Sequence, residues 1–231
     1  MLIHQEGKKI LLNALLILLL INAAMMIFFP KCLAAYIVLS ISIVLYLLML
    51  NFYRKPKRTY KGKLMGSVNA PTDGKVVVIE KVMEKEFFNE ERIQISIFMS
   101  FFNAHSNWIP VTGKIIHAEH VNGRFHAAYL PKSSAENEHS NVIVETPDGH
   151  KILTKQIAGA VARRIVTYVK KGDQCMIGDP LGFIKLGSRM DIFLPVDSEI
   201  LINLGDQVRA NKTFIAHLPG YNENKQESER E

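Results

Sequence analysis

A glycine–serine pair near the C-terminal end is the first place in this sequence where chemistry can be sought. Gly187-Ser188 lies in "FIKLGSRMDIFLP", between two apolar segments that have the composition of strands. The pair either forms a simple bend between the two strands or contains a reactive peptide bond. The second is conceivable because a backbone buried between strands can be strained. The dipeptide alone does not decide this, since Gly66-Ser67 repeats it in a polar linker.

Two further stretches each supply one residue suited to acid–base chemistry. Asp73 lies in "NAPTDGKVVVIE", in a turn that leads into a strand. His105 lies in "FMSFFNAHSNWIPVTG", between a very apolar strand and a Pro-Gly turn. Taken alone, Asp73 is explained as a turn-forming residue and His105 as a structural histidine. Phe101 and Phe102, beside His105, are predicted to fill the core rather than to contact lipid.

The histidines and cysteines do not predict a metal site. The polar loop "PKSSAENEHS" adds one more histidine to those around it. The histidines concerned are His105, His117, His120, His126 and His139. No pair of them has the HxxxH or HxH spacing of metal ligands. Cys32 and Cys175 form no CxxC motif, so neither a zinc site nor a disulfide framework is expected.

The elements that must position these residues are mostly strands. From about Val68 onward, short segments rich in Val, Ile and Phe alternate with Gly, Pro, Asn and Asp. This predicts a compact, mainly antiparallel β-sandwich or barrel-like domain with few helices. A hairpin is expected around Pro147-Asp148-Gly149, and one helix over Thr154 to Val169, where apolar residues recur at helical spacing. No internal repeat is apparent.

The first fifty residues predict a transmembrane hairpin of two helices. Ile10 to Phe29 and Cys32 to Leu50 are uncharged runs, each long enough to cross a bilayer, separated by Pro30-Lys31. A signal peptide is disfavoured, because no small-x-small cleavage site follows the first run and a second run begins at once. The short connection places both outer ends on the same side of the membrane.

Basic residues at these outer ends predict the orientation. They are Lys8, Lys9, Arg54, Lys55, Lys57, Arg58, Lys61 and Lys63, and they contribute to the net charge of +6. Positive residues stay in the cytoplasm, so the following domain is expected there, against an anionic lipid surface. No nucleic-acid partner is expected, because no aromatic platform or nucleic-acid fold accompanies the cluster.

Four stretches in register resemble the phosphatidylserine decarboxylase family. They are "PTDG", "FMSFFNAHSNWIPVTG", "SSAENEHS" and "FIKLGSRMDIFLP", and the resemblance extends from about Pro71 to Ala216. It is greatest to the short bacterial form with a membrane hairpin. The expected organisation is a hairpin (1–53, helices about 10–29 and 32–50), a basic linker (54–67), a catalytic domain (68–217) and a polar tail (218–231). This would be an enzyme of the bacterial inner membrane, with its catalytic domain on the cytoplasmic side.

The resemblance implies that the bond between Gly187 and Ser188 cleaves itself. The Ser188 hydroxyl would attack the carbonyl of Gly187, and β-elimination and hydrolysis would then leave Ser188 as a pyruvoyl group. The products would be a β chain (1–187) and an α chain (188–231), which remain together as a heterodimer. With this pyruvoyl group as its cofactor and no metal, the enzyme would convert phosphatidylserine into phosphatidylethanolamine and CO2.

The resemblance also implies catalytic roles for His105 and Asp73. Asp73 matches an aspartate in a P-x-D-G turn of the family, and a reactive serine needs a histidine oriented by a carboxylate. Longer members carry two histidines, in a pattern like D-Y-H-R-x-H-x-P. His105 matches the first, and Trp108 occupies the place of the second. The base in self-cleavage is therefore His105, water or another residue, while His105 is the expected proton donor in turnover.

Two alternative functions stay open at this level. A membrane-anchored, non-enzymatic β-barrel module of the lipoyl-like or adaptor type would also contain "APTDGKVVVIE", although the lysine in an M-K-M context that a carrier needs is missing. A decarboxylase of the same chemistry could act on a different serine-headgroup lipid. A metallopeptidase is disfavoured by the missing ligand spacing, and an uncleaved, degenerate homologue by the intact Gly187-Ser188, Asp73 and His105.

Overall fold

The computed structural model describes residues 2–30, 32–124, 137–159, 164–185 and 188–221 of the 231 in the sequence. The chain forms two compact units, Met1–Lys57 and Arg58–Glu231.

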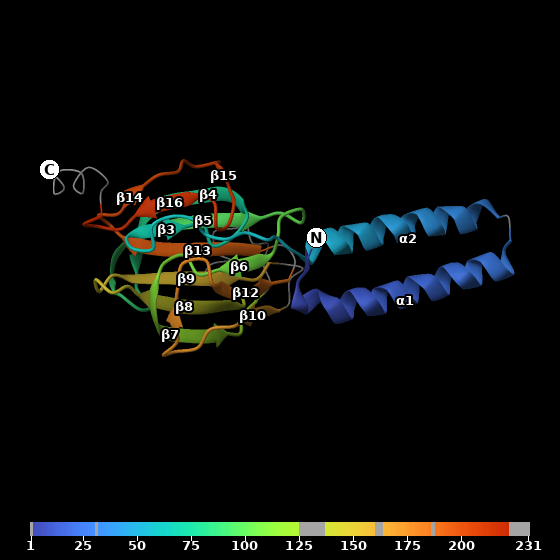
Figure 1. Cartoon of the computed structure of the whole chain (residues 1–231), viewed down its shortest axis with the longest axis horizontal. Coiled ribbons are helices and arrows are strands. Elements are labelled where there is room, and N and C mark those ends of the chain that lie inside the picture. Colours follow the sequence, from blue (N-terminus) through green and yellow to red (C-terminus); the bar gives the residue numbers. More distant parts are fainter. Residues whose placement is uncertain (1, 31, 125–136, 160–163, 186–187, 222–231) are drawn as a thin grey trace. The chain divides into compact units, whose positions relative to one another are not determined.

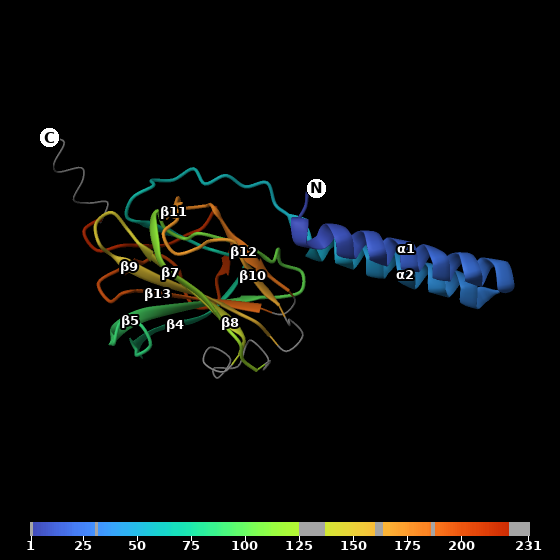
Figure 2. The same ribbon diagram turned by 90° about the horizontal axis from the view of Figure 1, so that it is seen from below.

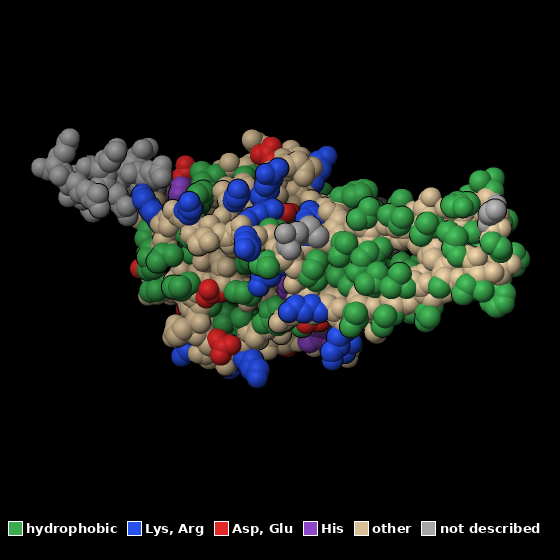
Figure 3. All heavy atoms as spheres, turned by 45° about the vertical axis from the view of Figure 1, so that its right-hand side comes forward, with side chains coloured by type: hydrophobic (Ala, Val, Ile, Leu, Met, Phe, Trp, Pro, Cys, Tyr) green, Lys and Arg blue, Asp and Glu red, His purple; other side chains and the backbone are tan. Residues whose placement is uncertain are grey.

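The first unit is a pair of long apolar helices, α1 (Gln5–Phe28) and α2 (Leu33–Phe52). Strands β1 (Leu2–Ile3) and β2 (Arg54–Lys55) pair antiparallel and join their outer ends. Both helices are long and apolar enough to cross a membrane, and Figure 3 shows hydrophobic side chains covering their surfaces. Two such helices indicate membrane association. Helix α1 begins at Gln5, before the uncharged run that starts at Ile10, and so includes Lys8 and Lys9. Lysine is a good helix former, and its long side chain can reach the membrane interface.

The second unit is built from fourteen described strands that form three antiparallel sheets. They are β3 (Ser67–Asn69), β4 (Gly74–Glu84), β5 (Glu90–Met99), β6 (Ser106–Trp108), β7 (Gly113–Val121), β8 (His139–Glu145), β9 (Lys151–Ile157), β10 (Ile165–Thr167), β11 (Gln174–Cys175), β12 (Pro180–Ile184), β13 (Ser188–Pro195), β14 (Glu199–Ile200), β15 (Gln207–Val208) and β16 (Phe214–His217). The large sheet has the order β11-β7-β8-β9-β13-β5-β4-β15, and the small sheets are β10-β12-β6 and β14-β16-β3 (Figures 1 and 2). The predicted mainly antiparallel β fold is confirmed.

The main core lies between the large sheet and the two small ones. Its members include Ile95 and Ile97 from β5, Leu181 and Ile184 from β12, and Ile215 from β16. Alternate residues of β13 also point into it, namely Met190, Ile192 and Leu194. On the opposite face of β13, Arg189 and Asp191 form a buried ion pair with Nε and Oδ1 2.6 Å apart. Strand β13 is therefore buried on both faces.

The β unit consists of two halves with the same topology. One half is β3–β5 together with β13–β16, and the other is β6–β12. When their strands are matched in chain order, every pairing has a counterpart: β4–β5 matches β7–β8, β5–β13 matches β8–β9, β15–β4 matches β11–β7, and β14–β16–β3 matches β10–β12–β6. The second half is inserted into the first, between β5 and β13.

Backbone hydrogen bonds repeat this symmetry. The amide of Trp108 donates to the carbonyl of Pro71, and the amide of Asn69 donates to that of Pro110, each at 2.9 Å. The absence of an internal repeat, inferred from the sequence, is therefore wrong as a statement about the fold. An inserted repeat is not tandem, and only short matches survive in the sequence, such as the Gly-Asp-Gln triplets at residues 172–174 and 205–207.

The helix predicted over Thr154 to Val169 is also wrong in the described part of that segment. Thr154 to Ile157 belong to β9, which pairs with both β8 and β13, and β10 begins at Ile165. Pairing on two sides outweighs a weak helical spacing, and the β-branched residues of this stretch favour strands. The predicted hairpin does join β8 to β9, with the Thr146 amide 2.9 Å from the His150 carbonyl.

Candidate active site

Ser188 is the first residue of β13, where the chain returns from the inserted half. It pairs with Met99, the last residue of β5. Its side chain is completely buried, and its Oγ has no hydrogen-bond partner among the described residues. Gly187, the other half of the predicted cleavage site, lies outside the described residues. A buried hydroxyl without a partner costs free energy, so the Ser188 hydroxyl calls for an explanation, as do those of Ser106, Thr154 and Ser198.

Two connections between the halves meet around this serine. Residues 100–104, here called the crossover loop, lead from β5 to the inserted half, and residues 185–187 lead back to β13. At one end Ser188 pairs with Met99, and at the other the Ile184 amide donates to the His105 carbonyl at 3.2 Å. The two connections are therefore tied together at both ends. This arrangement places His105 next to Ile184, the last residue of β12.

His105 is completely buried and has a defined tautomer. Its Nδ1 lies 3.0 Å from the backbone carbonyl of Asn103. Because a carbonyl can only accept a hydrogen bond, Nδ1 carries the proton and the lone pair of the neutral ring is on Nε2. The Asn103 side chain in turn accepts hydrogen bonds from the amide and the hydroxyl of Ser100, at 2.8 and 2.7 Å. The crossover loop thus presets His105 as a proton acceptor through Nε2.

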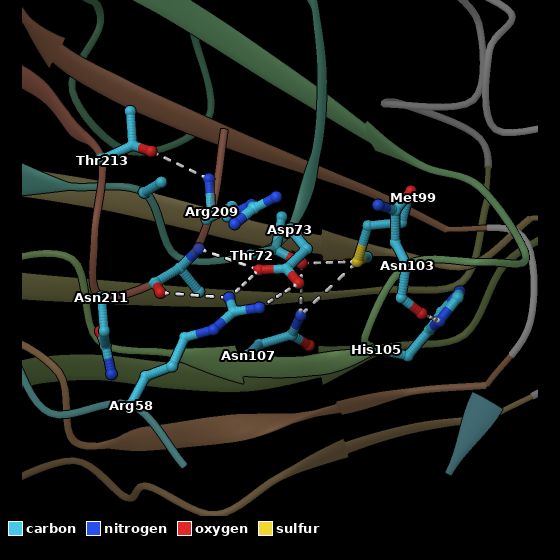
Figure 4. A network of polar contacts seen from close by, with 12 residues as sticks. Arg58, Thr72, Asp73, Met99, Asn103, His105, Asn107, Arg209, Asn211 and Thr213 are labelled. Atoms are coloured by element: carbon cyan, nitrogen blue, oxygen red, sulfur yellow. Dashed lines mark hydrogen bonds and ion pairs between the residues drawn. The ribbon is translucent and has the colours of Figure 1, made fainter. Parts of the chain in front are cut away.

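Asp73 is buried but does not contact His105. Its Oδ1 accepts the amide hydrogen of Ala210 at 3.0 Å, and the guanidinium of Arg58 binds both oxygens, with Nη2 2.9 Å from Oδ2. No hydrogen bond joins these described residues, Asp73 and His105, and in Figure 4 the His105 ring points toward Asn103. The arrangement expected from the resemblance, a histidine oriented by this carboxylate, is not formed in this structure.

The counterpart of Asp73 in the inserted half is Thr112. Its Oγ1 accepts the amide hydrogen of Ile177 at 3.0 Å, as Asp73 accepts that of Ala210. This hydrogen bond fastens the same loop in both halves, so it is a structural contact. What distinguishes Asp73 is its charge and its ion pair with Arg58.

A chain of buried polar side chains leads from the Asp73 turn to the strand pair of Ser188. The Thr72 hydroxyl donates to the Met99 sulfur at 2.6 Å, and Met99 pairs with Ser188. Asn107 donates to Thr72 at 3.4 Å and accepts from Gln156 at 2.8 Å (Figure 4 shows Thr72, Met99 and Asn107). The chain therefore joins both halves beside the serine.

Sequence reasoning did not find this polar chain. Thr72 and Asn107 lie inside two of the quoted motifs, where their polarity in apolar surroundings was the available signal. Gln156 lies in the segment predicted to be a helix, and a helix there does not predict its hydrogen bond to Asn107.

Two further residues of the motifs take no part in this cluster. Trp108 is buried, and its indole has no basic nitrogen, so it cannot replace a histidine as the base. His139 has the same ring geometry as His105, with Nδ1 2.7 Å from the Asn137 carbonyl. It lies on β8, opposite Ile157 of β9. Residues 133–136 of the same motif lie outside the described residues, and His126 does as well.

No group of three or more His, Cys, Asp or Glu residues that could hold a metal ion occurs in the described part of the chain. The fold and the site together define a class of protein. It is a membrane-associated β protein with a buried serine and histidine at the junction of two structural halves.

Comparisons with known proteins identify the family within this class. A family model described as phosphatidylserine decarboxylase matches residues 45–216. The chain is 51% identical over 216 residues to the phosphatidylserine decarboxylase proenzyme of Bacteroides thetaiotaomicron, covering 94% of this chain and 95% of the relative. It is 50% identical to that of Parabacteroides distasonis (94% and 98% covered) and 46% identical to that of Porphyromonas gingivalis (94% and 99% covered). The chain belongs to the phosphatidylserine decarboxylase family, as its motifs predicted.

The activity is therefore the decarboxylation of phosphatidylserine. The cofactor of this family is a pyruvoyl group, which forms from a serine when the proenzyme cleaves itself. The described residues fit such a group. Ser188 offers a buried, unbonded hydroxyl at the start of a strand, and the segment of His105 is tied to the one that precedes it.

Proposed function

We propose that Ser188 is the serine that becomes the pyruvoyl group and that the bond between Gly187 and Ser188 is the one that is cleaved. The observation that carries the proposal is the buried Ser188 Oγ, which has no partner among the described residues although it lies at the first pairing position of a central strand. Gly66-Ser67, the other glycine–serine pair, precedes and begins the short strand β3 of a small sheet.

In the proposed cleavage, Ser188 Oγ attacks the carbonyl carbon of Gly187 and the peptide C–N bond breaks to give an ester. Removal of the Cα proton of residue 188 then expels the Gly187 carboxylate. The remaining dehydroalanine takes up water and releases ammonia, which leaves the pyruvoyl group. We assign to His105 the role of base in these steps, because the Asn103 carbonyl holds the proton on Nδ1 and leaves the lone pair on Nε2.

In turnover the pyruvoyl group supplies an electron-withdrawing carbonyl next to the amino acid headgroup. We assign to His105 the handling of one proton: the lone pair on Nε2 would accept the proton that the headgroup ammonium loses, and Nε2 would then return it to the headgroup carbon that loses CO2. The complete burial of His105 keeps bulk water away from this proton.

Asp73 supports this chemistry through the scaffold, in our proposal. It holds the Ala210 loop and Arg58, and the neighbouring Thr72 holds Met99 opposite Ser188. Asp73 is thus a positioning residue that acts through the strand of Ser188 rather than through His105.

The two products of cleavage are proposed to be residues 1–187 and 188–231. Strand β13 opens the second fragment and stays paired with β5 and β9, which belong to the first. We propose residues 68–217 as the catalytic domain, with 54–67 as linker and 218–231 as tail. The basic residues at both outer ends of the helix pair favour the cytoplasmic face of the cell membrane, with its anionic lipids as the partner surface.

The test is the fate of the purified chain on a denaturing gel, with intact masses. The parent protein is expected to give fragments 1–187 and 188–231, and the second should lack a free amino group at its start. Ser188→Ala should remain one chain of about the full 26.1 kDa. The matched control is Ser67→Ala, which changes the other glycine–serine pair and should be cleaved as the parent is. A parent chain that stays uncut with lipid present would overturn the assignment.

A further inference from the structure

We propose that the crossover loop is a membrane-contact loop, through which the active site meets an anionic bilayer. This inference rests on the proposed function, because it concerns how phosphatidylserine reaches Ser188 and His105. The residues that would make the contact are Phe101 and Phe102, with the cations Arg164 and Lys185 on segments joined by backbone hydrogen bonds to that of His105.

The first observation is the exposure of an aromatic ring next to the site. Phe102 is 66% exposed, and its ring packs edge to face against Phe101 with centroids 5.8 Å apart. The prediction that Phe102 fills the core is therefore wrong. An exposed phenylalanine three residues from a buried histidine is costly in water, whereas aromatic rings are favoured at the boundary between bilayer and water.

The second observation is the burial of the reacting groups. Ser188 and His105 are completely buried, yet the substrate is a lipid whose acyl chains stay in the bilayer. The headgroup must reach the site without the whole lipid leaving the membrane. Since the crossover loop ends at His105, contact between this loop and the headgroup region gives the headgroup a short path.

The third observation is the charge around the loop. The Lys185 amide donates to the Arg164 carbonyl at 3.1 Å, and the preceding amide, of Ile184, bonds the carbonyl of His105. Two cations therefore belong to the segments that flank His105, and the Arg164 side chain is exposed. The crossover loop itself contains no Asp or Glu. Aromatic rings on a loop without acidic residues, with cations on the adjoining segments, match a surface that contains negatively charged phosphatidylserine.

Another exposed apolar residue provides a control. Leu204 is 67% exposed, almost the same as Phe102, and lies in the turn before β15. It is aliphatic and is followed closely by Asp206 rather than by cations. Leu204 is expected to make no membrane contact, so a pair of matched variants can separate a specific contact from non-specific hydrophobic adsorption.

The first experiment measures depth in the bilayer. Phe102→Trp and Leu204→Trp are made in full-length Ser188→Ala and placed in nanodiscs of phosphatidylcholine and phosphatidylserine with spin-labelled lipid. The emission of native Trp108 is subtracted by using Ser188→Ala alone. The tryptophan at position 102 should be quenched at least about threefold more strongly than that at position 204, because only the former enters the interface. Equal quenching at the two positions would overturn the proposal.

The second experiment separates lipid contact from chemistry. Phe102→Ser and Leu204→Ser are assayed on phosphatidylserine in bilayers and on short-chain phosphatidylserine below its micellar concentration. For Phe102→Ser the ratio of bilayer to monomer turnover should fall about tenfold, as expected when part of a phenyl ring no longer inserts. For Leu204→Ser the ratio should be unchanged. An equal loss on both substrates would refute a membrane role.

Self-cleavage distinguishes this inference from the proposed function. It is an intramolecular reaction, so Phe102→Ser should still yield fragments 1–187 and 188–231. If the parent itself stays uncut, the assignment of Ser188 fails. If cleavage is intact but the two ratios agree, only the membrane-contact loop fails.

Discussion

The two halves of the β unit differ at one pair of matching positions, where two neighbouring strands end. In one half these positions hold Thr146 and His150, and in the other they hold Met99 and Ser188. The first pair closes a tight hairpin between β8 and β9. The second pair lies where the chain leaves β5 for the inserted half and where it returns to β13. The same framework thus gives a plain turn in one half and a serine and a histidine in the other. The residues assigned to chemistry lie where the symmetry is broken.

Asp73 and Thr112 show the same contrast at a finer scale. Each accepts a loop amide at 3.0 Å, so a neutral hydroxyl is sufficient for the structural contact. The extra carboxylate charge of Asp73 is balanced by Arg58, which comes from the basic linker. The comparison separates what the fold requires at this position from what only the reactive half contains.

The largest effect is expected at His105. His105→Gln removes the lone pair on Nε2, so self-cleavage or turnover should fall by about 100-fold or more, the usual contribution of a general base or acid. The half-time of the uncut chain and the turnover of pre-cleaved protein give the two readings. His139→Gln is the control, because His139 has the same Nδ1 contact but lies on β8, which β9 separates from β13. Equal losses in both variants would remove the distinction between the two histidines.

Asp73→Thr gives both halves a threonine at this position, because the counterpart of Asp73 is Thr112. The introduced hydroxyl can still accept the Ala210 amide, but Arg58 loses its carboxylate partner and, among the described residues, keeps only the Ala210 carbonyl. We expect the free energy of unfolding to fall by about 1–3 kcal/mol, the cost of removing one member of a buried polar pair. Cleavage should be slower as well. Stability is measured by thermal unfolding in the Ser188→Ala background. Cleavage is measured as the half-time of the uncut chain with Ser188 intact. Thr112→Asp is the reverse exchange, and Asp73→Thr behaving as the parent in both would contradict the comparison.

Cleavage of the bond between Gly187 and Ser188 should not separate the two fragments. Because β13 is paired with β5 and β9 and carries a buried ion pair, residues 188–231 are held by backbone hydrogen bonds on both sides. Fragments 1–187 and 188–231 should elute together in detergent and separate only on unfolding. Size-exclusion chromatography followed by a denaturing gel measures this. A free 188–231 fragment under native conditions would show that the pairing does not survive cleavage.

The smallest effect is expected at Cys175, whose counterpart is Val208. Burial raises the pKa of the Cys175 thiol to about 11, so its reactive thiolate is absent at neutral pH and forms only as the pH approaches that value. In a Cys32→Ser background, maleimide labelling of the folded protein should stay minimal from pH 7 to about pH 9. Cys175→Val should change stability by less than about 1.5 kcal/mol. Rapid labelling at pH 7 would show that the residue is accessible.

Several features were predictable from the sequence because they depend on neighbouring residues. The two uncharged runs identify the helices, and β-branched segments between turn residues identify a β domain. The order of four motifs predicts the family, and Gly187-Ser188 lies in the last of them. The helix predicted over Thr154 to Val169 failed, because pairing with strands distant in the sequence decided the structure of β9.

What the sequence alone determined is thus the membrane-associated segment, the fold class and the family, and it named the candidate residues for the reaction, since local hydrophobicity and residue type carry that information. Only the tertiary structure decided which groups meet. It placed Met99 opposite Ser188, tied His105 to the returning connection, and joined Asp73 to Arg58 rather than to His105. It also exposed Phe102 beside the site. These outcomes depend on the register of strands far apart in the chain, which cooperative packing sets and no short motif encodes.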